Sequence, residues 1–213
     1  MEILADPITI NCRKVLAGMK MLGADYTLTK IDYFNGEQKS PEYVAINPMA
    51  AIPAMRDGDL MLNESNAILQ YAADKVGNGQ AYPTDLAARA DVNRWLLWES
   101  SAWFPTCYTY LVENCVKPLL GAETDQSVLD AEVENFHKLA GILDSRLAGS
   151  TFICGSNPTI ADVAVAAPMH LHGWSKLPLD QHGNIRRWIG DVEAQPWWKA
   201  THVGEGFVAS EAA

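Results

Sequence analysis

The chain has no long apolar run and no surplus of basic residues. No apolar stretch reaches the length of a membrane span, and residues 1–6 lack the basic and apolar regions of a signal peptide. The 16 Lys and Arg residues are outnumbered by 26 Asp and Glu, which gives a formal net charge of −10. Surfaces that bind nucleic acid or anionic membranes select clustered Lys and Arg, so neither partner is expected. The sequence predicts a cytoplasmic protein in which any anionic ligand needs a local positive site.

Cysteine is scarce, and no metal-binding spacing is present. No Cys-x-x-Cys or zinc-finger pattern occurs, and the two histidines of His170-x-His172 point to different faces of a predicted helix. We expect no metal site. The sequence also lacks a glycine-rich phosphate loop and a recognisable Ser-His-Asp arrangement. The cysteines are predicted to be reduced thiols: Cys12, Cys107, Cys115 and Cys154.

The first part of the chain alternates short strands with helices. At 213 residues and 48% hydrophobic composition, the chain is long enough for one large or two modest cores. Strands are predicted over 3–5, 26–32, 53–56 and 60–62, and Asp57-Gly58 is typical of a tight hairpin between the last two. Apolar residues at helical spacing predict a helix that ends at Gly23 and another from Ser65 to Gly77. This order predicts a mixed sheet.

The second part has helical periodicity. A buried stripe is predicted on one long helix, and Pro105 is expected to kink or end the preceding helix. Thr159-Ile160-Ala161-Asp162 fits a capping box, which is a structural role. The stripe consists of Leu129, Val133, Phe136, Ala140, Leu143 and Leu147. Of the aromatic residues near Pro105, Trp95 and Trp98 are expected in the core, and the candidates for a pocket wall are Trp103, Phe104, Tyr108 and Tyr110.

Two separated pieces of the first part suggest a peptide site. In Ile52-Pro53, the X-Pro bond can be cis and turn the preceding backbone outward as an unpaired edge. Glu64-Ser65 opens a helix whose free N–H groups favour a carboxylate. Together the two pieces could hold both ends of a small acidic peptide. The alternative is a plain hairpin followed by a capped helix.

These pieces, in this order, resemble the glutathione transferases. Two further matches support the resemblance: the segment 36–42, Gly-Glu-Gln-Lys-Ser-Pro-Glu, and the capping box at 159–162. The resemblance implies a thioredoxin-like domain over 1–77 with a mixed sheet, a linker over 78–84 and an all-helical domain over 85–213. It also implies a homodimer that acts in detoxification. Residues 204–213 are expected to form either a loose tail or a flap over the site.

The resemblance also implies where glutathione binds. Thr9 occupies the place of the Ser or Thr of the phi, theta and nu types, and Asn11 matches the Thr-x-Asn variant of the nu type. A hydroxyl and an amide can both donate to sulfur and favour the thiolate, although either residue could instead cap the helix. The other contacts that the resemblance implies are Gln38 and Lys39 for the glycine carboxylate, Ile52 and Pro53 for the cysteinyl backbone, Glu64 for the γ-glutamyl amine and Ser65 for its carboxylate.

Cys12 is a competing candidate for the reactive group. The first helical turn can lower the pKa of a thiol, but the spacing of Cys12 to Val15, Leu16 and Met19 predicts a packed side chain. We expect a glutathione transferase that uses the thiolate of glutathione to attack a small electrophile. The alternatives are a glutathione-dependent reductase of disulfides or peroxides, and a non-catalytic binding or assembly module on the same fold.

Overall fold

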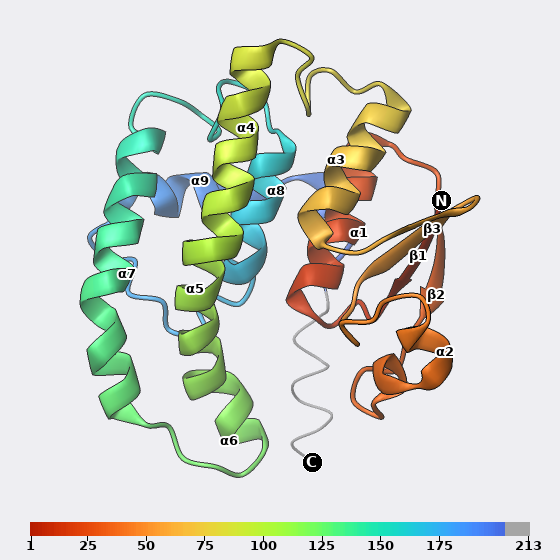
Figure 1. Ribbon diagram of the computed structural model, residues 1–213. Coiled ribbons are helices and arrows are strands. Elements are labelled where there is room, and N and C mark those ends of the chain that lie inside the picture. Colours follow the sequence, from red (N-terminus) through yellow and green to blue (C-terminus); the bar gives the residue numbers. More distant parts are fainter. Residues whose placement is uncertain (203–213) are drawn as a thin grey trace. The chain divides into compact units, whose positions relative to one another are not determined.

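The computed structural model describes residues 1–202, and these form two compact units (Figure 1). Within these residues the first unit comprises Met1–Thr84 together with the segment from Pro196 to His202, and the second unit begins at Asp85 and runs to Gln195. This division differs from the predicted ranges, because residues 78–84 and the segment from Pro196 both group with the first unit. The predicted tail or flap over 204–213 lies outside the described residues.

The first unit is built on a four-stranded mixed sheet of order β2-β1-β3-β4. β1 pairs parallel with β2 and antiparallel with β3, and β3 pairs antiparallel with β4. Gly58, at the first position of the two-residue loop between β3 and β4, has φ 58°, a conformation that glycine adopts without strain. The thioredoxin-like fold with a mixed sheet is confirmed. The strands are β1 (Glu2–Ala5), β2 (Thr27–Lys30), β3 (Ala54–Asp57) and β4 (Leu60–Leu62).

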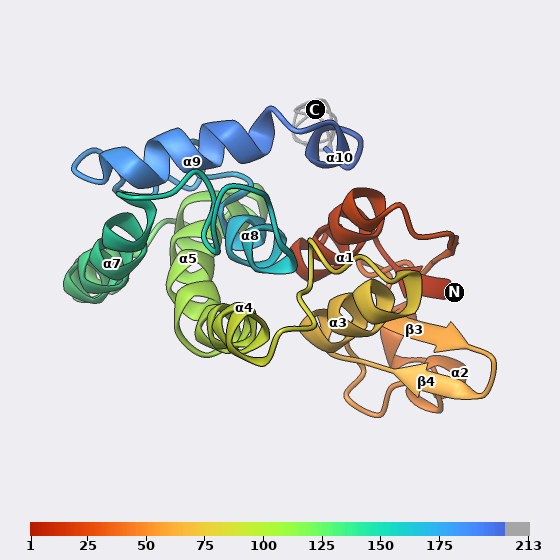
Figure 2. The same cartoon turned by 90° about the horizontal axis from the view of Figure 1, so that it is seen from above.

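Two helices, α1 (Ile10–Leu22) and α3 (Ser65–Val76), lie side by side against the sheet (Figures 1 and 2). Both end at a left-handed glycine as predicted, Gly23 for α1 and Gly77 for α3. The two helices approach closely at Gly18, where an added Cβ would lie 2.1 Å from Leu69 Cδ2. The start of α1 is therefore held near the start of α3.

Three short elements of the first unit were not predicted. Between β2 and β3 lie a 3₁₀ turn, Glu37–Lys39, and α2 (Pro41–Val44), which the Ser40 hydroxyl caps. The third is α10 (Pro196–Lys199), which packs on α1. The Arg13 guanidinium lies over the Trp198 ring at 4.3 Å, and its Nε donates to the Thr201 carbonyl at 3.1 Å. These contacts explain why the segment from Pro196 groups with the first unit.

The second unit is helical, which confirms the predicted class of this part of the chain. Pro105 lies just after a π-helical turn at 99–103, and Pro118 follows a second π-helical turn at 112–116. Proline lacks an N–H and crowds the carbonyl four residues earlier, so the regular helix is interrupted there, as predicted for Pro105. The helices are α4 (Leu86–Trp98), α5 (Phe104–Leu111), α6 (Lys117–Leu119), α7 (Gln126–Leu147), α8 (Ile160–Ala166), followed by a 3₁₀ turn Ala167–Met169, and α9 (Gly183–Glu193).

The core of the second unit contains most of the predicted stripe on α7. Five of its six members are buried, but Val133 is 40% exposed, so the prediction for Val133 was wrong. Val133 lies at the edge of the buried face of α7, because the 3.6-residue helical period rotates its side chain toward solvent. None of the helices within residues 1–202 combines the length and apolar character needed to cross a membrane.

Candidate active site

The start of α3 is open and strained. Glu64, directly before the helix, has φ 66° and ψ 110°, and within the described residues its side chain makes no capping hydrogen bond. A left-handed φ is costly for a residue with a Cβ, and such strain is concentrated at functional sites. The Glu64 side chain is exposed, whereas Ser65 is buried. The first N–H groups of α3 are therefore available to a ligand.

A polar network fixes the segment that precedes this helix. The Ile52-Pro53 bond is cis, and the Ala51 carbonyl before it accepts from Tyr43 Oη at 2.8 Å and from Asn47 Nδ2 at 2.7 Å. The buried Asn47 also accepts from Asn63 Nδ2 at 2.9 Å. Residues 51–53 and the start of α3 are thus tied together through Asn47, a residue that the sequence analysis did not single out.

Thr9 precedes α1 in an extended conformation, and its side chain makes no capping bond to that helix among the described residues. Its hydroxyl instead donates to the Asp6 carbonyl at 3.3 Å and also contacts the Cys12 thiol. The alternative that Thr9 serves as a side-chain cap is therefore not supported. The half-buried hydroxyl remains able to turn toward a ligand.

Cys12 is fully buried. Burial raises the pKa of its thiol to about 12, and the hydrogen bond from Thr9 opposes this effect only in part. A thiol with so high a pKa stays protonated near neutral pH and is a poor nucleophile. The packed role expected for Cys12 is confirmed.

Asn11 connects the starts of the two helices. The Ser65 hydroxyl donates to Asn11 Oδ1 at 3.4 Å. Because the carboxamide oxygen of Asn11 faces Ser65, its NH₂ group is the part left to donate to a ligand. The structure therefore brings Asn11 and Ser65 together, although they are far apart in the sequence.

Lys14 belongs to the same cluster and was missed by the sequence analysis. Its side chain is only 2% exposed, and Nζ donates to Ser65 Oγ at 3.1 Å and to Asn66 Oδ1 at 3.4 Å. Lys14 follows Asn11 by three residues, which places both on one face of α1. That spacing was the one signal in the sequence that could have identified it.

Gln38 and Lys39 lie in the 3₁₀ turn at 37–39, and no hydrogen bond within residues 1–202 joins either of them to Asn11 or Ser65. Gln38 is buried, and its Oε1 accepts no hydrogen bond from the described residues. Lys39 is exposed. A buried amide with an unused acceptor can still serve a ligand.

The four aromatic residues predicted to form a pocket wall differ in how much of each side chain is exposed. Trp103 is fully buried, stacks on Trp98 and donates its indole N–H to the Val165 carbonyl at 3.2 Å. Tyr110 is also buried, against Phe136, and burial raises its pKa to about 12. Both side chains thus pack in the core of the second unit, and their assignment to a pocket wall stays a prediction.

Phe104 and Tyr108 differ from these core residues. Their rings stack at 5.6 Å between centroids, and Tyr108 is 43% exposed. Phe104 is partly exposed. Of the four predicted residues, these two present aromatic surface that a small molecule can reach.

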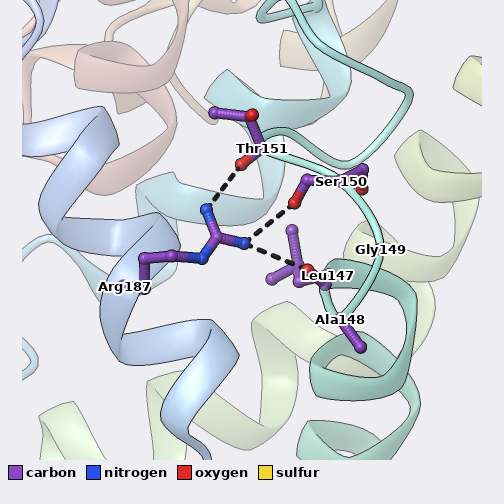
Figure 3. A pocket seen from close by; sticks show the side chains of 6 residues that line it. All are labelled: Leu147, Ala148, Gly149, Ser150, Thr151 and Arg187. Atoms are coloured by element: carbon purple, nitrogen blue, oxygen red, sulfur yellow. Dashed lines mark hydrogen bonds between the residues drawn. The ribbon is translucent and has the colours of Figure 1, made fainter.

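A shallow hollow of about 340 Å³ at the end of α7 has a structural explanation (Figure 3). Arg187 reaches across it and donates to the carbonyls of Leu147, Ser150 and Thr151 at 2.9 to 3.1 Å. A guanidinium at the carboxyl end of a helix satisfies carbonyls that have no partner within the helix. The hollow therefore marks a cap and offers little to a ligand. No group of three or more His, Cys, Asp or Glu residues within 1–202 is arranged to hold a metal ion.

Comparison with known proteins agrees with this geometry. Residues 2–74 match the family model of the glutathione S-transferase N-terminal domain, and residues 102–196 match that of the C-terminal domain. The chain belongs to the glutathione S-transferase family. Both halves of the described fold are thus shared with this family.

Individual members of the glutathione S-transferase family align over most of their length. A probable glutathione S-transferase GSTF2 of Oryza sativa is 29% identical, covering 92% of this chain and 93% of the relative. Glutathione S-transferase 4 of Zea mays is 32% identical, covering 87% of this chain and 80% of the relative. A structure of glutathione S-transferase I from mais in complex with an atrazine glutathione conjugate has a TM-score of 0.85 and 25% identity, covering 100% of this chain and 99% of that one.

Proposed function

We propose that this protein binds reduced glutathione and transfers it to a small electrophile. The observation that carries the proposal is the joining of two helix starts by one hydrogen bond, between Ser65 on α3 and Asn11 on α1. One start presents N–H groups that suit a carboxylate, and the other presents donors that suit a thiolate. Membership in the glutathione S-transferase family supports the same activity.

Each part of the tripeptide has a matching group in the first unit. The exposed Glu64 carboxylate receives the γ-glutamyl amine, and the start of α3 at Ser65 receives the γ-glutamyl carboxylate. The cysteinyl backbone pairs with the backbone of Ile52, next to Pro53. The glycine carboxylate lies by Lys39 and Gln38.

The chemistry requires only that the thiol of glutathione be ionised and that its sulfur be oriented toward the electrophilic atom. A free thiol has a pKa near 8.5, and the thiolate is the nucleophile. Thr9 donates its hydroxyl to the sulfur, with help from the Asn11 NH₂ group, so the thiolate is favoured and its proton is released to solvent. The sulfur electron pair then forms a bond to the electrophilic atom, and the leaving group departs with its own electron pair.

The electrophile binds against aromatic surface of the helical unit. Phe104 and Tyr108 offer a stacked, partly exposed pair suited to aromatic or apolar substrates. The transferase acts as a homodimer in the cytoplasm, in detoxification. The free cysteines at positions 12, 107, 115 and 154 suit a reducing compartment.

The experiment is calorimetric titration with reduced glutathione in two buffers of different ionisation enthalpy. Saturable binding with release of a proton near neutral pH is expected for the wild-type protein, and Thr9→Ala is expected to abolish the proton release and lower the turnover with an electrophile about 100-fold. Thr27→Ala, an exposed position on β2, serves as the control.

The same assay distinguishes the other functions. A small disulfide as substrate tests the reductase alternative, for which the buried Cys12 is not required: activity on disulfides alone that persists in Cys12→Ser would favour it. If glutathione does not bind, the peptide site is wrong and the chain is better viewed as a non-catalytic module.

A further inference from the structure

Lys14 is the most deeply buried lysine at the candidate site, and its ammonium points at the start of α3. Nζ lies 3.1 Å from Ser65 Oγ and 3.4 Å from Asn66 Oδ1. Lys14 occurs on α1, so its position depends on the close contact of α1 and α3 near Gly18. We propose that Lys14 is a positioning residue that sets the Ser65 hydroxyl as a donor for the γ-glutamyl carboxylate of glutathione. This inference rests on the proposed function.

The directions of the hydrogen bonds at Ser65 support this role. An ammonium has three donors and no acceptor, so Ser65 Oγ must accept from Lys14. The single hydroxyl proton of Ser65 then points away from Lys14. In the structure that proton is donated to Asn11 Oδ1, at a long distance of 3.4 Å. A carboxylate oxygen is a stronger acceptor than an amide oxygen and can take this proton when glutathione binds.

Charge supports the same role. The start of a helix carries about half a positive charge, and a lysine beside it adds a full charge within the same few ångströms. The protein as a whole has a net charge of −10, so an anionic ligand needs such a local positive group. The Asn66 side chain, which accepts from Nζ, holds the ammonium at this place.

The test compares two ligands in three proteins. The ligands are glutathione and γ-aminobutyryl-cysteinylglycine, which is glutathione without the γ-glutamyl carboxylate. The proteins are wild type, Lys14→Met, and the control Lys20→Met, which removes an exposed lysine from the same helix. Calorimetry gives the dissociation constant of each ligand, and the preference is the ratio of the two constants.

The preference of the wild-type protein for glutathione is expected to fall about tenfold in Lys14→Met and to stay unchanged in Lys20→Met, as the loss of one charge-assisted hydrogen bond implies. In turnover with an electrophile, KM for glutathione rises while kcat changes little. The ratio is measured within one protein, so it does not depend on how much of the sample is folded. Lys14→Gln, which keeps a donor but no charge, gives a second variant if Lys14→Met does not fold, with an intermediate preference expected.

Two results overturn the inference, and they are distinguishable. If wild type prefers glutathione and the variants at position 14 keep that full preference, Lys14 has no part in binding the carboxylate, and the proposed function stands. If wild type binds neither peptide, the proposed function fails, and the role of Lys14 fails with it.

Discussion

Two helix starts in this molecule, those of α3 and α8, have opposite designs. At α8, Thr159 has an ordinary extended backbone and forms a capping box with Asp162. Asp162 is fully buried and accepts from the backbone N–H groups of Ile153 and Thr159 and from Trp188 Nε1, at 2.8 to 2.9 Å. At α3, Glu64 has a left-handed backbone, and its side chain makes no capping bond to the described part of the chain.

The difference shows how one local motif serves either stability or binding. A hydroxyl and a carboxyl residue occur at both starts, but at α8 they satisfy the helix and at α3 they leave it open. A closed start contributes stability, whereas an open and strained start costs stability and keeps its N–H groups for a ligand. The four predictions below test this contrast, from the largest expected effect to the smallest.

Asp162→Ala is expected to lower the free energy of unfolding by about 3 to 5 kcal/mol, because the buried donors that bond to its carboxylate, the Thr159 hydroxyl among them, all lose their acceptor at once. Urea denaturation measures the loss. The folded fraction of the variant should bind glutathione as wild type does, because the start of α8 is not part of the proposed glutathione site. Asp130→Ala, at an exposed position on α7, is the control and should change stability by less than about 0.5 kcal/mol. If Asp162→Ala lowers the free energy of unfolding by less than about 1 kcal/mol, the start of α8 does not stabilise the protein in the way described.

Gly18→Ala is expected to destabilise the protein by about 1 to 3 kcal/mol, because the new Cβ would lie 2.1 Å from the fully buried Leu69 side chain. The change moves α1 relative to α3, so glutathione affinity should fall as well. Gly190→Ala is the control: it lies on α9 with no atom within 4 Å of the new Cβ, and should stabilise by about 0.5 to 1 kcal/mol. Unchanged glutathione affinity in Gly18→Ala would show that the open start does not depend on α1.

Glu64→Gly is expected to stabilise the protein by about 1 kcal/mol and to weaken glutathione binding, because glycine adopts φ 66° without strain but lacks the carboxylate. Glu64→Ala is the matched control, since it loses the same carboxylate and keeps the strained Cβ. Thermal unfolding and calorimetry on both variants separate the two effects. Equal stability of the two variants would mean that the start of α3 stores no strain.

The start of α9 provides the smallest effect, which is a pH dependence. His182 precedes this helix, and burial, followed by the neighbouring His137 at 3.0 Å, lowers the pKa of its imidazole below 6.5. As the pH falls through 6.5, the unfolded chain binds a proton before the folded protein does, so stability decreases. The loss is expected to stay below about 1 kcal/mol between pH 6.5 and the lowered pKa. Urea denaturation at several pH values should find a smaller slope in His182→Gln than in wild type, and an unchanged slope in His202→Gln.

Local features of the fold could be predicted from the sequence. Gly23, Gly77 and the hairpin at Asp57-Gly58 depend on backbone conformations that few residues adopt, and the capping box at Thr159 depends on four adjacent residues. Such features are encoded within a few positions of the chain. They gave the element order and hence the fold class.

The features that could not be predicted depend on residues far apart in the sequence. The burial of Lys14 requires α3 to pack on α1, and the burial of Trp103 requires the Val165 carbonyl from another helix. Val133 follows the apolar period of α7 and is nevertheless exposed, because no neighbouring element covers that edge of the helix within the described unit. Periodicity identifies an apolar face, but packing decides how wide a face is buried.

The contact of Arg13 with Trp198 has a consequence for synthesis on the ribosome. The first unit needs the segment from Pro196 to be complete, although its other residues are made first. All of the residues from Asp85 to Gln195 are translated before Trp198 reaches Arg13. One side of α1 in the nascent amino-terminal unit therefore stays uncovered until the whole helical unit and Trp198 have been translated. The part of the protein that is translated first is thus the last to be finished.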